Sequence, residues 1–330
     1  MRFLILGGTS FLSRWTAREA VARGHEVICA ARGRTGSVPV GARLVVVDRD
    51  RPGALAPLAG ERFDAVIDVA RAALGWVLDA LDALADDARH WTFVSSISAY
   101  ADTATPGQTI DAPLCEPIRD RTLEFAAEHY GGIKVASELA VRERLAERAF
   151  VVRPGLISGP DDRTDRFGYW PARFARGGPT VVPDAPQQPI QHIDVRDLAA
   201  WIVSAAETAL VGTYDAIGPV TELESLLREC AELVGPPDLE LVPIPPRTLT
   251  EADITPWSGP KSLPLWLPAD HYGMVAHDPA PARAAGLRIR DSADTVGATL
   301  ADERARGLDR PRLAGLTPDD ERDLLRHLGG

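Results

Sequence analysis

The sequence predicts an α/β protein whose parallel sheet is covered by helices on both faces. Short apolar segments recur along the first half of the chain, at residues 2–6, 25–31, 44–47, 63–70, 91–94 and 150–153. Segments with helical spacing separate most of them, among them 13–24, 74–85 and a helix that contains Tyr130. Because parallel strands need a crossover connection, which is usually a helix, this alternation predicts a doubly wound sheet.

The first strand opens a βαβ unit. The apolar run 2–6 leads directly into Gly7-Gly8-Thr9, and the helical segment that follows carries Ala17, Ala20 and Val21 on one face. A helix N-terminus binds phosphate because its first N–H groups lack partners within the helix. The sequence therefore predicts a dinucleotide site at this turn, formed by Gly7, Thr9, Ser10, Phe11 and Leu12.

The glycine pattern of this turn is incomplete. Dinucleotide-binding turns have glycine at three places, which fall here on Gly7, Ser10 and Ser13. Ser10 adds a side chain where the backbone approaches the pyrophosphate, and Ser13 adds one where the helix packs on the strand. Serine is the smallest polar replacement and can itself bond a phosphate oxygen. A weakened nucleotide site is favoured over a turn that has lost its ligand.

The end of the second strand indicates which dinucleotide binds. An NAD site normally places a carboxylate there, whereas this chain has Ala31 followed by Arg32-Gly33-Arg34. Two guanidinium groups suit a 2′-phosphate, so we expect NADP(H) to be preferred over NAD(H), the alternative being two solvated surface arginines. Asp48, after the third strand, is placed to meet an adenine edge, and Ala70, which ends the fourth strand, completes the expected cofactor set.

Tyr130 and Lys134 stand four residues apart, which places them on one face of a helix. An ammonium beside a phenol stabilises the phenolate and lowers the tyrosine pKa, and such a tyrosine can exchange a proton with a carbonyl or alcohol oxygen. A serine hydroxyl can hydrogen-bond the same oxygen, and Ser95-Ser96 follow the fifth strand. The spacing alone is weak evidence, because it also occurs by chance.

These motifs together resemble the extended short-chain dehydrogenases/reductases, of the NAD(P)-dependent epimerase/dehydratase type. The resemblance covers nearly the whole chain and rests on the opening turn, residues 94–100 (VSSISAY), the Tyr130/Lys134 pair, residues 153–160 (RPGLISGP) and residues 191–198 (QHIDVRDL). It implies a Rossmann-type sheet with a smaller, discontinuous C-terminal substrate lobe. The expected nucleotide domain spans 1–160 plus about 190–220, and the expected substrate lobe spans about 161–190 plus 220–330.

The resemblance also implies the catalytic residues. In the family the serine lies four residues before the tyrosine of the strand-end motif, which selects Ser96. Tyr130 then corresponds to the general acid/base. Lys134 corresponds to the residue that lowers the tyrosine pKa and holds the nicotinamide ribose.

One departure from the family narrows the expected activity. Sugar-nucleotide epimerases usually carry an asparagine, which binds the diphosphate side of the substrate, where this chain has Leu156. Loss of a buried hydrogen-bonding group penalises a polar ligand by a few kcal/mol. We therefore expect an NADP(H)-dependent oxidoreductase acting on a carbonyl or secondary alcohol of a small molecule. The alternatives are an NAD-dependent epimerase or dehydratase of a nucleotide sugar, and a non-catalytic nucleotide-sensing or interaction protein.

The substrate is expected against residues 161–189. Aromatic side chains there alternate with four arginines at 163, 166, 173 and 176, as in a pocket with apolar walls and a few fixed charges. The expected substrate residues are Ser98, Phe167, Tyr169 and Trp170. Alternatively, Trp170 and Phe174 pack a short helix into the core.

Two further segments have an expected structure. Residues 102–121 form either a lid or an exposed loop. Residues 191–194 are expected to begin the next sheet strand, with Asp194 and Asp197 capping a helix over 198–206.

Composition sets the remaining expectations. The net charge of −11 argues against nucleic acid or an anionic membrane as a partner. The chain has no run of eighteen apolar residues and enters its first strand without a signal peptide, so a cytoplasmic location is expected. Three cysteines without metal or redox spacing predict no metal site. A homodimer is expected only by family analogy.

Overall fold

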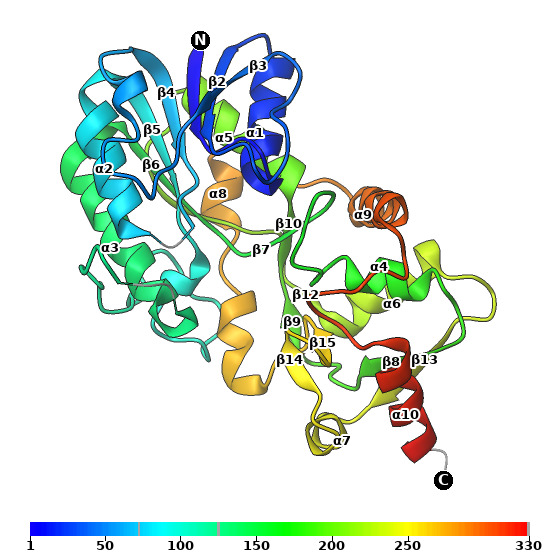
Figure 1. Ribbon diagram of the computed structural model, residues 1–330. Coiled ribbons are helices and arrows are strands. Elements are labelled where there is room, and N and C mark those ends of the chain that lie inside the picture. The colour runs from blue at the N-terminus through cyan, green and yellow to red at the C-terminus, as the bar shows by residue number, and fades with distance from the viewer. Residues whose placement is uncertain (72, 124–125, 329–330) are drawn as a thin grey trace.

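The computed structural model describes residues 1–71, 73–123 and 126–328, which form two lobes (Figure 1). The N-terminal lobe contains a seven-stranded parallel sheet of order β11-β6-β5-β4-β1-β2-β3, which confirms the predicted fold class. Its strands are β1 (Arg2–Leu6), β2 (Glu26–Ala31), β3 (Ala42–Val46), β4 (Phe63–Asp68), β5 (Ala88–Val94), β6 (Ala149–Pro154) and β11 (Gly212–Ala216). The sequence reasoning missed β11, a short edge strand with no apolar run.

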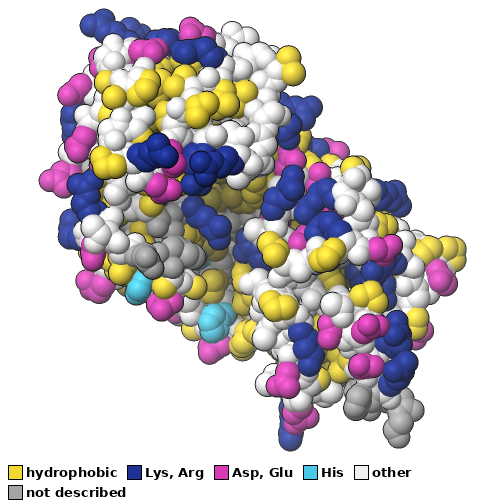
Figure 2. Space-filling view, viewed as in Figure 1, with side chains coloured by type: hydrophobic (Ala, Val, Ile, Leu, Met, Phe, Trp, Pro, Cys, Tyr) yellow, Lys and Arg dark blue, Asp and Glu magenta, His cyan; other side chains and the backbone are white. Residues whose placement is uncertain are grey.

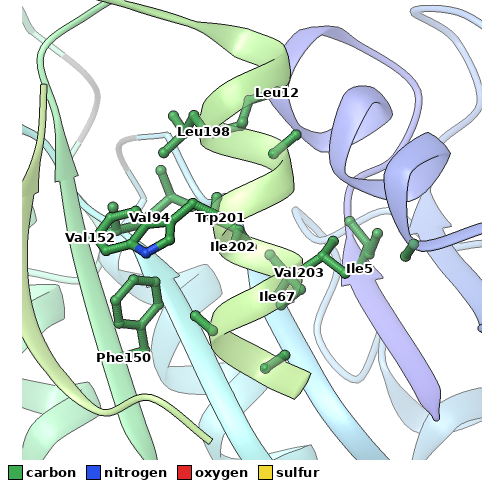
Figure 3. Close-up of a cluster of buried hydrophobic side chains, with 14 of the residues drawn as sticks. Ile5, Leu12, Ile67, Val94, Phe150, Val152, Leu198, Trp201, Ile202 and Val203 are labelled. Atoms are coloured by element: carbon green, nitrogen blue, oxygen red, sulfur yellow. The ribbon is translucent and has the colours of Figure 1, made fainter. Parts of the chain in front are cut away.

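Helices cover both faces of this sheet. On one face lie α1 (Phe11–Ala22) and α5 (Val195–Glu207), and on the other α2 (Leu74–Leu84) and α3 (Tyr130–Leu145). Phe3 and Ile5 of β1 pack toward α1 and α5, whereas Leu4 and Leu6 pack toward α2 and α3. Successive strand residues point to opposite faces, so an uninterrupted apolar strand is buried on both. Figure 3 shows the α5 side, where Trp201 lies above Phe150 and Val152.

The second lobe has a core of its own, which includes Trp170, Phe174 and Leu227. It is built from α4 (Tyr169–Phe174), β8 (Pro179–Pro183), β9 (Pro189–Ile190), β12 (Thr221–Glu222), α6 (Leu223–Val234), β13 (Glu240–Ile244), α7 (Pro246–Glu251), β14 (Thr255–Trp257), β15 (Ser262–Pro264), α9 (Ser292–Arg306) and α10 (Pro318–Leu328). Helix α8 (Ala280–Ala284) packs against the first lobe. Short 3-10 helices span Ala56–Leu58, Ala85–Asp87, Ile97–Ala99, Ala127–His129, Ala146–Arg148 and Ala269–Val275.

The strand expected at 191–194 does not join the central sheet. It is β10 (His192–Asp194), which pairs in parallel with β7 (Leu156–Ser158) in a separate two-stranded sheet, because β11 already occupies the edge beside β6. Asp194 caps α5 as predicted and accepts a hydrogen bond from the backbone N–H of Arg196 at 2.8 Å. Asp197 is not a cap: it lies inside α5 and binds Arg290.

Residues 102–121 are anchored to the C-terminal part of the chain. The backbone N–H of Gly107 donates to Ala276 O at 2.5 Å, and Asp278 N–H donates to Gln108 O at 3.0 Å. The hydroxyl of Thr103 donates to a backbone carbonyl in the same region, that of Asp270, at 3.2 Å. In the described part of the chain, no helix is long and apolar enough to cross a membrane.

Candidate active site

The predicted dinucleotide turn packs tightly on the second strand. Gly7 and Gly8 have φ values of 141° and 102°, which side chains rarely adopt. A Cβ added to Gly8 would lie 2.4 Å from the sulfur of Cys29, so Gly8 is required where the turn meets β2. The hydroxyl of Ser13 donates to Ser10 O at 2.8 Å and is thereby satisfied within the helix. The serine at the third glycine position is thus compatible with the turn.

The first turn of α1 is open to an anion. Ser10 is exposed with an extended backbone at the N-cap, and its side chain makes no cap hydrogen bond. The hydroxyl of Thr9 pairs with that of Thr35 at 2.8 Å, which holds the loop after β2 against the turn. Phe11 begins the helix, and Leu12 is buried in the core. Uncapped N–H groups of this kind fit a pyrophosphate.

The two arginines after β2 have different surroundings. Arg32 forms an ion pair with Asp50 at 3.2 Å and lies 3.9 Å from Asp48. Arg34 is exposed and has no ion pair within the described ranges. Asp48 is half-buried and also lies 3.8 Å from Arg51. Arg34 is therefore the guanidinium more open to a ligand phosphate.

The three predicted catalytic side chains meet at the carboxyl edge of the sheet. Ser96 follows β5, and its hydroxyl hydrogen-bonds the side chain of Tyr130, the first residue of α3. One turn later, Lys134 Nζ donates to Ala70 O at 2.6 Å and to Val94 O at 2.8 Å, at the ends of β4 and β5. An ammonium has three donors, so these two bonds leave one for a cofactor hydroxyl.

The pKa of the Tyr130 hydroxyl is raised in the protein without bound cofactor. Burial raises its pKa, while the hydrogen bond with Ser96 and the charges of Arg71 and Arg166 act against that rise. The sequence reasoning expected Lys134 to lower this pKa toward neutrality, and that expectation is wrong for the free protein. The phenol therefore carries its proton at neutral pH.

Lys134 is itself shifted by its surroundings. Burial lowers its pKa to about 7, and the carboxylates of Asp68 and Glu138 oppose the change. A lysine this close to its neutral form contributes only part of a positive charge near Tyr130. The two backbone carbonyls that accept its hydrogen bonds fix its position whether or not it is charged.

The predicted aromatic wall is a core instead. Phe167, Tyr169 and Trp170 are each 2% exposed, and Trp170 Nε1 donates to Pro264 O at 2.9 Å. All three belong to the core of the second lobe. Phe174 is also buried, so the alternative in which Trp170 and Phe174 pack a short helix into the core was right. Ser98 is half-buried and lines a cavity of about 480 Å³ that also borders Tyr130.

Two arginines near Tyr130 were not among the predicted site residues. Arg71 follows β4, and Arg166 comes from the second lobe; both charges act on the tyrosine hydroxyl. Arg166 belonged to the group of four arginines, but the sequence did not distinguish it from Arg173, whose Nε donates to Glu321 at 2.6 Å. Arg176 likewise pairs with Asp309 at 3.7 Å.

Residues 3–216 match the sequence model of the NAD dependent epimerase/dehydratase family. The chain belongs to this family. It is an NAD(P)-dependent enzyme of the extended short-chain dehydrogenase/reductase type, as the motifs predict. No curated protein matches the chain in sequence.

Several solved structures resemble this chain over most of its length. The WbmG enzyme of Bordetella bronchiseptica, solved with NAD, is 18% identical with a TM-score of 0.69, and 93% of this chain and 95% of that one are covered. UDP-N-acetylglucosamine 4-epimerase from Bacillus cereus is 15% identical with a TM-score of 0.67, covering 96% and 100%. At such low identity the likeness shows a common fold.

Proposed function

We propose that this enzyme is an NADP(H)-dependent oxidoreductase that acts on a carbonyl or secondary alcohol of a small molecule. The observation that carries the proposal is the contact between Ser96 and Tyr130 beside the anchored Lys134. When bound, the nicotinamide supplies or accepts the hydride. In the direction of reduction, Tyr130 gives its proton to the substrate oxygen and Ser96 orients that oxygen by a hydrogen bond.

Leu156 favours this reaction over nucleotide-sugar epimerisation. Its side chain is 3% exposed within the core of the second lobe, where it offers no hydrogen bond to a diphosphate. The opposing observation is that the structural relatives include a UDP-N-acetylglucosamine 4-epimerase. The two reactions differ in stoichiometry, because a reductase consumes one NADPH for each product and an epimerase consumes none. Screening carbonyl compounds for NADPH oxidation, in parallel with UDP-sugars for epimerised product, tests the proposal directly.

The cofactor preference is tested by calorimetric titration of the cofactor-free protein with NADPH and NADH. We expect NADPH to bind more tightly, because Arg34 is open to a 2′-phosphate. Arg34→Ala should weaken NADPH binding roughly 10- to 100-fold, as for the loss of a charged hydrogen bond, and leave NADH binding unchanged. The control is Arg89→Ala. The Arg89 side chain is 85% exposed and lies near the start of β5, at the amino edge of the sheet. Equal binding of the two cofactors to the unaltered protein would contradict the preference.

The raised pKa of Tyr130 predicts a pH dependence that needs no substrate. The difference in phenolate absorbance between the unaltered protein and Tyr130→Phe should titrate above the usual tyrosine pKa of about 10. Since Arg166 stabilises the phenolate, Arg166→Leu should move this titration to still higher pH. Oxidation of an alcohol needs the deprotonated Tyr130, so its rate should rise as pH approaches that pKa. Reduction needs the protonated Tyr130, so its rate should not change with pH near neutrality. A Tyr130 titration below about pH 9, which is about one unit under the usual tyrosine pKa, would contradict the raised pKa.

A further inference from the structure

Arg166 is a half-buried cation whose terminal nitrogens have no acidic partner in the described ranges. Its Nε donates to the hydroxyl of Thr164 at 3.2 Å, and among the residues that the structure describes its guanidinium forms no ion pair. Asp162 is the carboxylate whose charge acts on Arg166, but its two oxygens accept hydrogen bonds from Thr164, at 2.9 Å each. A desolvated charge without a counterion is costly, so an incoming anion is the natural partner.

The guanidinium is held in place by an aromatic ring. Trp257 lies under Arg166, with 5.4 Å between the guanidinium carbon and the ring centroid. Trp257 ends β14 with φ of 70°, a left-handed conformation that is an outlier for a bulky side chain. Strained backbone of this kind clusters at ligand sites. The strained backbone orients the ring that supports the guanidinium.

Positive charge approaches Tyr130 from both lobes. Arg166 belongs to the second lobe and Arg71 to the nucleotide lobe, and each charge acts on the other and on the tyrosine hydroxyl. Figure 2 shows a hollow between the lobes with lysine and arginine side chains along its sides. A ligand that reacts at Tyr130 therefore lies between two cationic groups.

We propose that Arg166, supported by Trp257, binds an anionic group of the substrate close to the carbon that reacts, with Arg71 as a second positive charge. The guanidinium fork matches the paired oxygens of a carboxylate or a phosphate ester. The substrates are then keto acids, hydroxy acids or their phosphate-ester counterparts. This inference rests on the proposed oxidoreductase function and names the substrate class of the same site.

The kinetic test compares matched acidic and neutral carbonyl compounds with NADPH. The pairs are phenylglyoxylate with its methyl ester, and dihydroxyacetone phosphate with dihydroxyacetone. The ester is the more electrophilic partner, so a preference for the acid comes from binding. In at least one of the two pairs, we expect kcat/KM to be roughly 10- to 100-fold higher for the charged compound than for its neutral partner. Arg166→Leu should abolish this preference mainly through KM, and Arg166→Lys should restore part of it.

The control variant removes an equivalent pair elsewhere. Arg18 stacks on Trp15 at 4.7 Å on the exposed side of α1, and Arg18→Leu should keep the preference. Equal kcat/KM for charged and neutral partners, or a preference that survives Arg166→Leu, would overturn the anion site and leave the oxidoreductase function standing.

A binding measurement separates the two proposals if no carbonyl compound is reduced. Calorimetric titration of the full-length protein with oxalate and with glycerol 3-phosphate tests the anion site without turnover. Binding of either probe that is lost in Arg166→Leu and kept in Arg18→Leu supports the site. Binding of neither probe overturns it. Arg166-dependent binding of UDP-glucose alone also overturns it, because the anion would then be a nucleotide diphosphate distant from the reacting carbon.

Discussion

Replacing Tyr130 with phenylalanine is expected to lower kcat by about a hundredfold or more, with little change in cofactor affinity. The substitution removes only the hydroxyl that hydrogen-bonds Ser96 and that, in the proposed function, exchanges a proton with the substrate oxygen. The ring stays beside Lys134 Nζ, which lies 5.7 Å from its centroid. The measurement is steady-state NADPH oxidation with a substrate from the carbonyl screen, together with calorimetric titration of NADPH.

The matched control is Tyr272→Phe, a half-buried tyrosine of the second lobe. It loses the same hydroxyl away from the sheet edge, so its kcat should stay close to that of the unaltered protein. Ser96→Ala should slow turnover without changing NADPH affinity, because it removes the hydrogen bond that we propose orients the substrate oxygen. Normal turnover by Tyr130→Phe would contradict the proposed role of Tyr130 as the general acid/base and favour a non-catalytic nucleotide-binding role.

Replacing Arg153 with methionine is expected to lower the free energy of unfolding by about 3–5 kcal/mol. Arg153 is 1% exposed and binds both carboxylate oxygens of Glu138, at 2.8 and 2.7 Å. Its third contact is the hydroxyl of Tyr100 at 2.8 Å, which in turn donates to Asp215. The substitution leaves Glu138 as a buried carboxylate without its main counterion. Urea-induced unfolding monitored by tryptophan fluorescence measures the loss.

The double variant Arg153→Met/Glu138→Gln removes both charges of this pair. Because it leaves no uncompensated carboxylate, it should be more stable than Arg153→Met alone. Arg247→Met breaks an exposed pair with Glu251 and should cost at most about 1 kcal/mol. A loss from Arg153→Met as small as that of Arg247→Met would show that the buried pair contributes little. The result also bears on catalysis, since Glu138 lies one helical turn beyond Lys134 and opposes the lowering of its pKa.

The nucleotide lobe was predictable from sequence because its information is local. Uninterrupted apolar strands such as 2–6 indicate burial on both faces, and the spacing of Tyr130 and Lys134 places them on one helical face. The edge strand β11 lacked an apolar run, and β10 looked like a sheet strand because its pairing partner cannot be inferred from its own residues. Pairing is a long-range choice, which a local pattern does not encode.

Sequence alone determined the fold class and the family, and it selected Ser96, Tyr130 and Lys134 as the candidate trio, because each depends on periodicity or on a motif with fixed spacing. Only the tertiary structure decided the electrostatics of the site. It buried Phe167, Tyr169 and Trp170 in a core, and among the arginines interleaved with them it paired Arg173 and left Arg166 stacked on Trp257. The pKa of Tyr130 follows from that arrangement, since burial and charge–charge distance depend on residues that are remote in the chain.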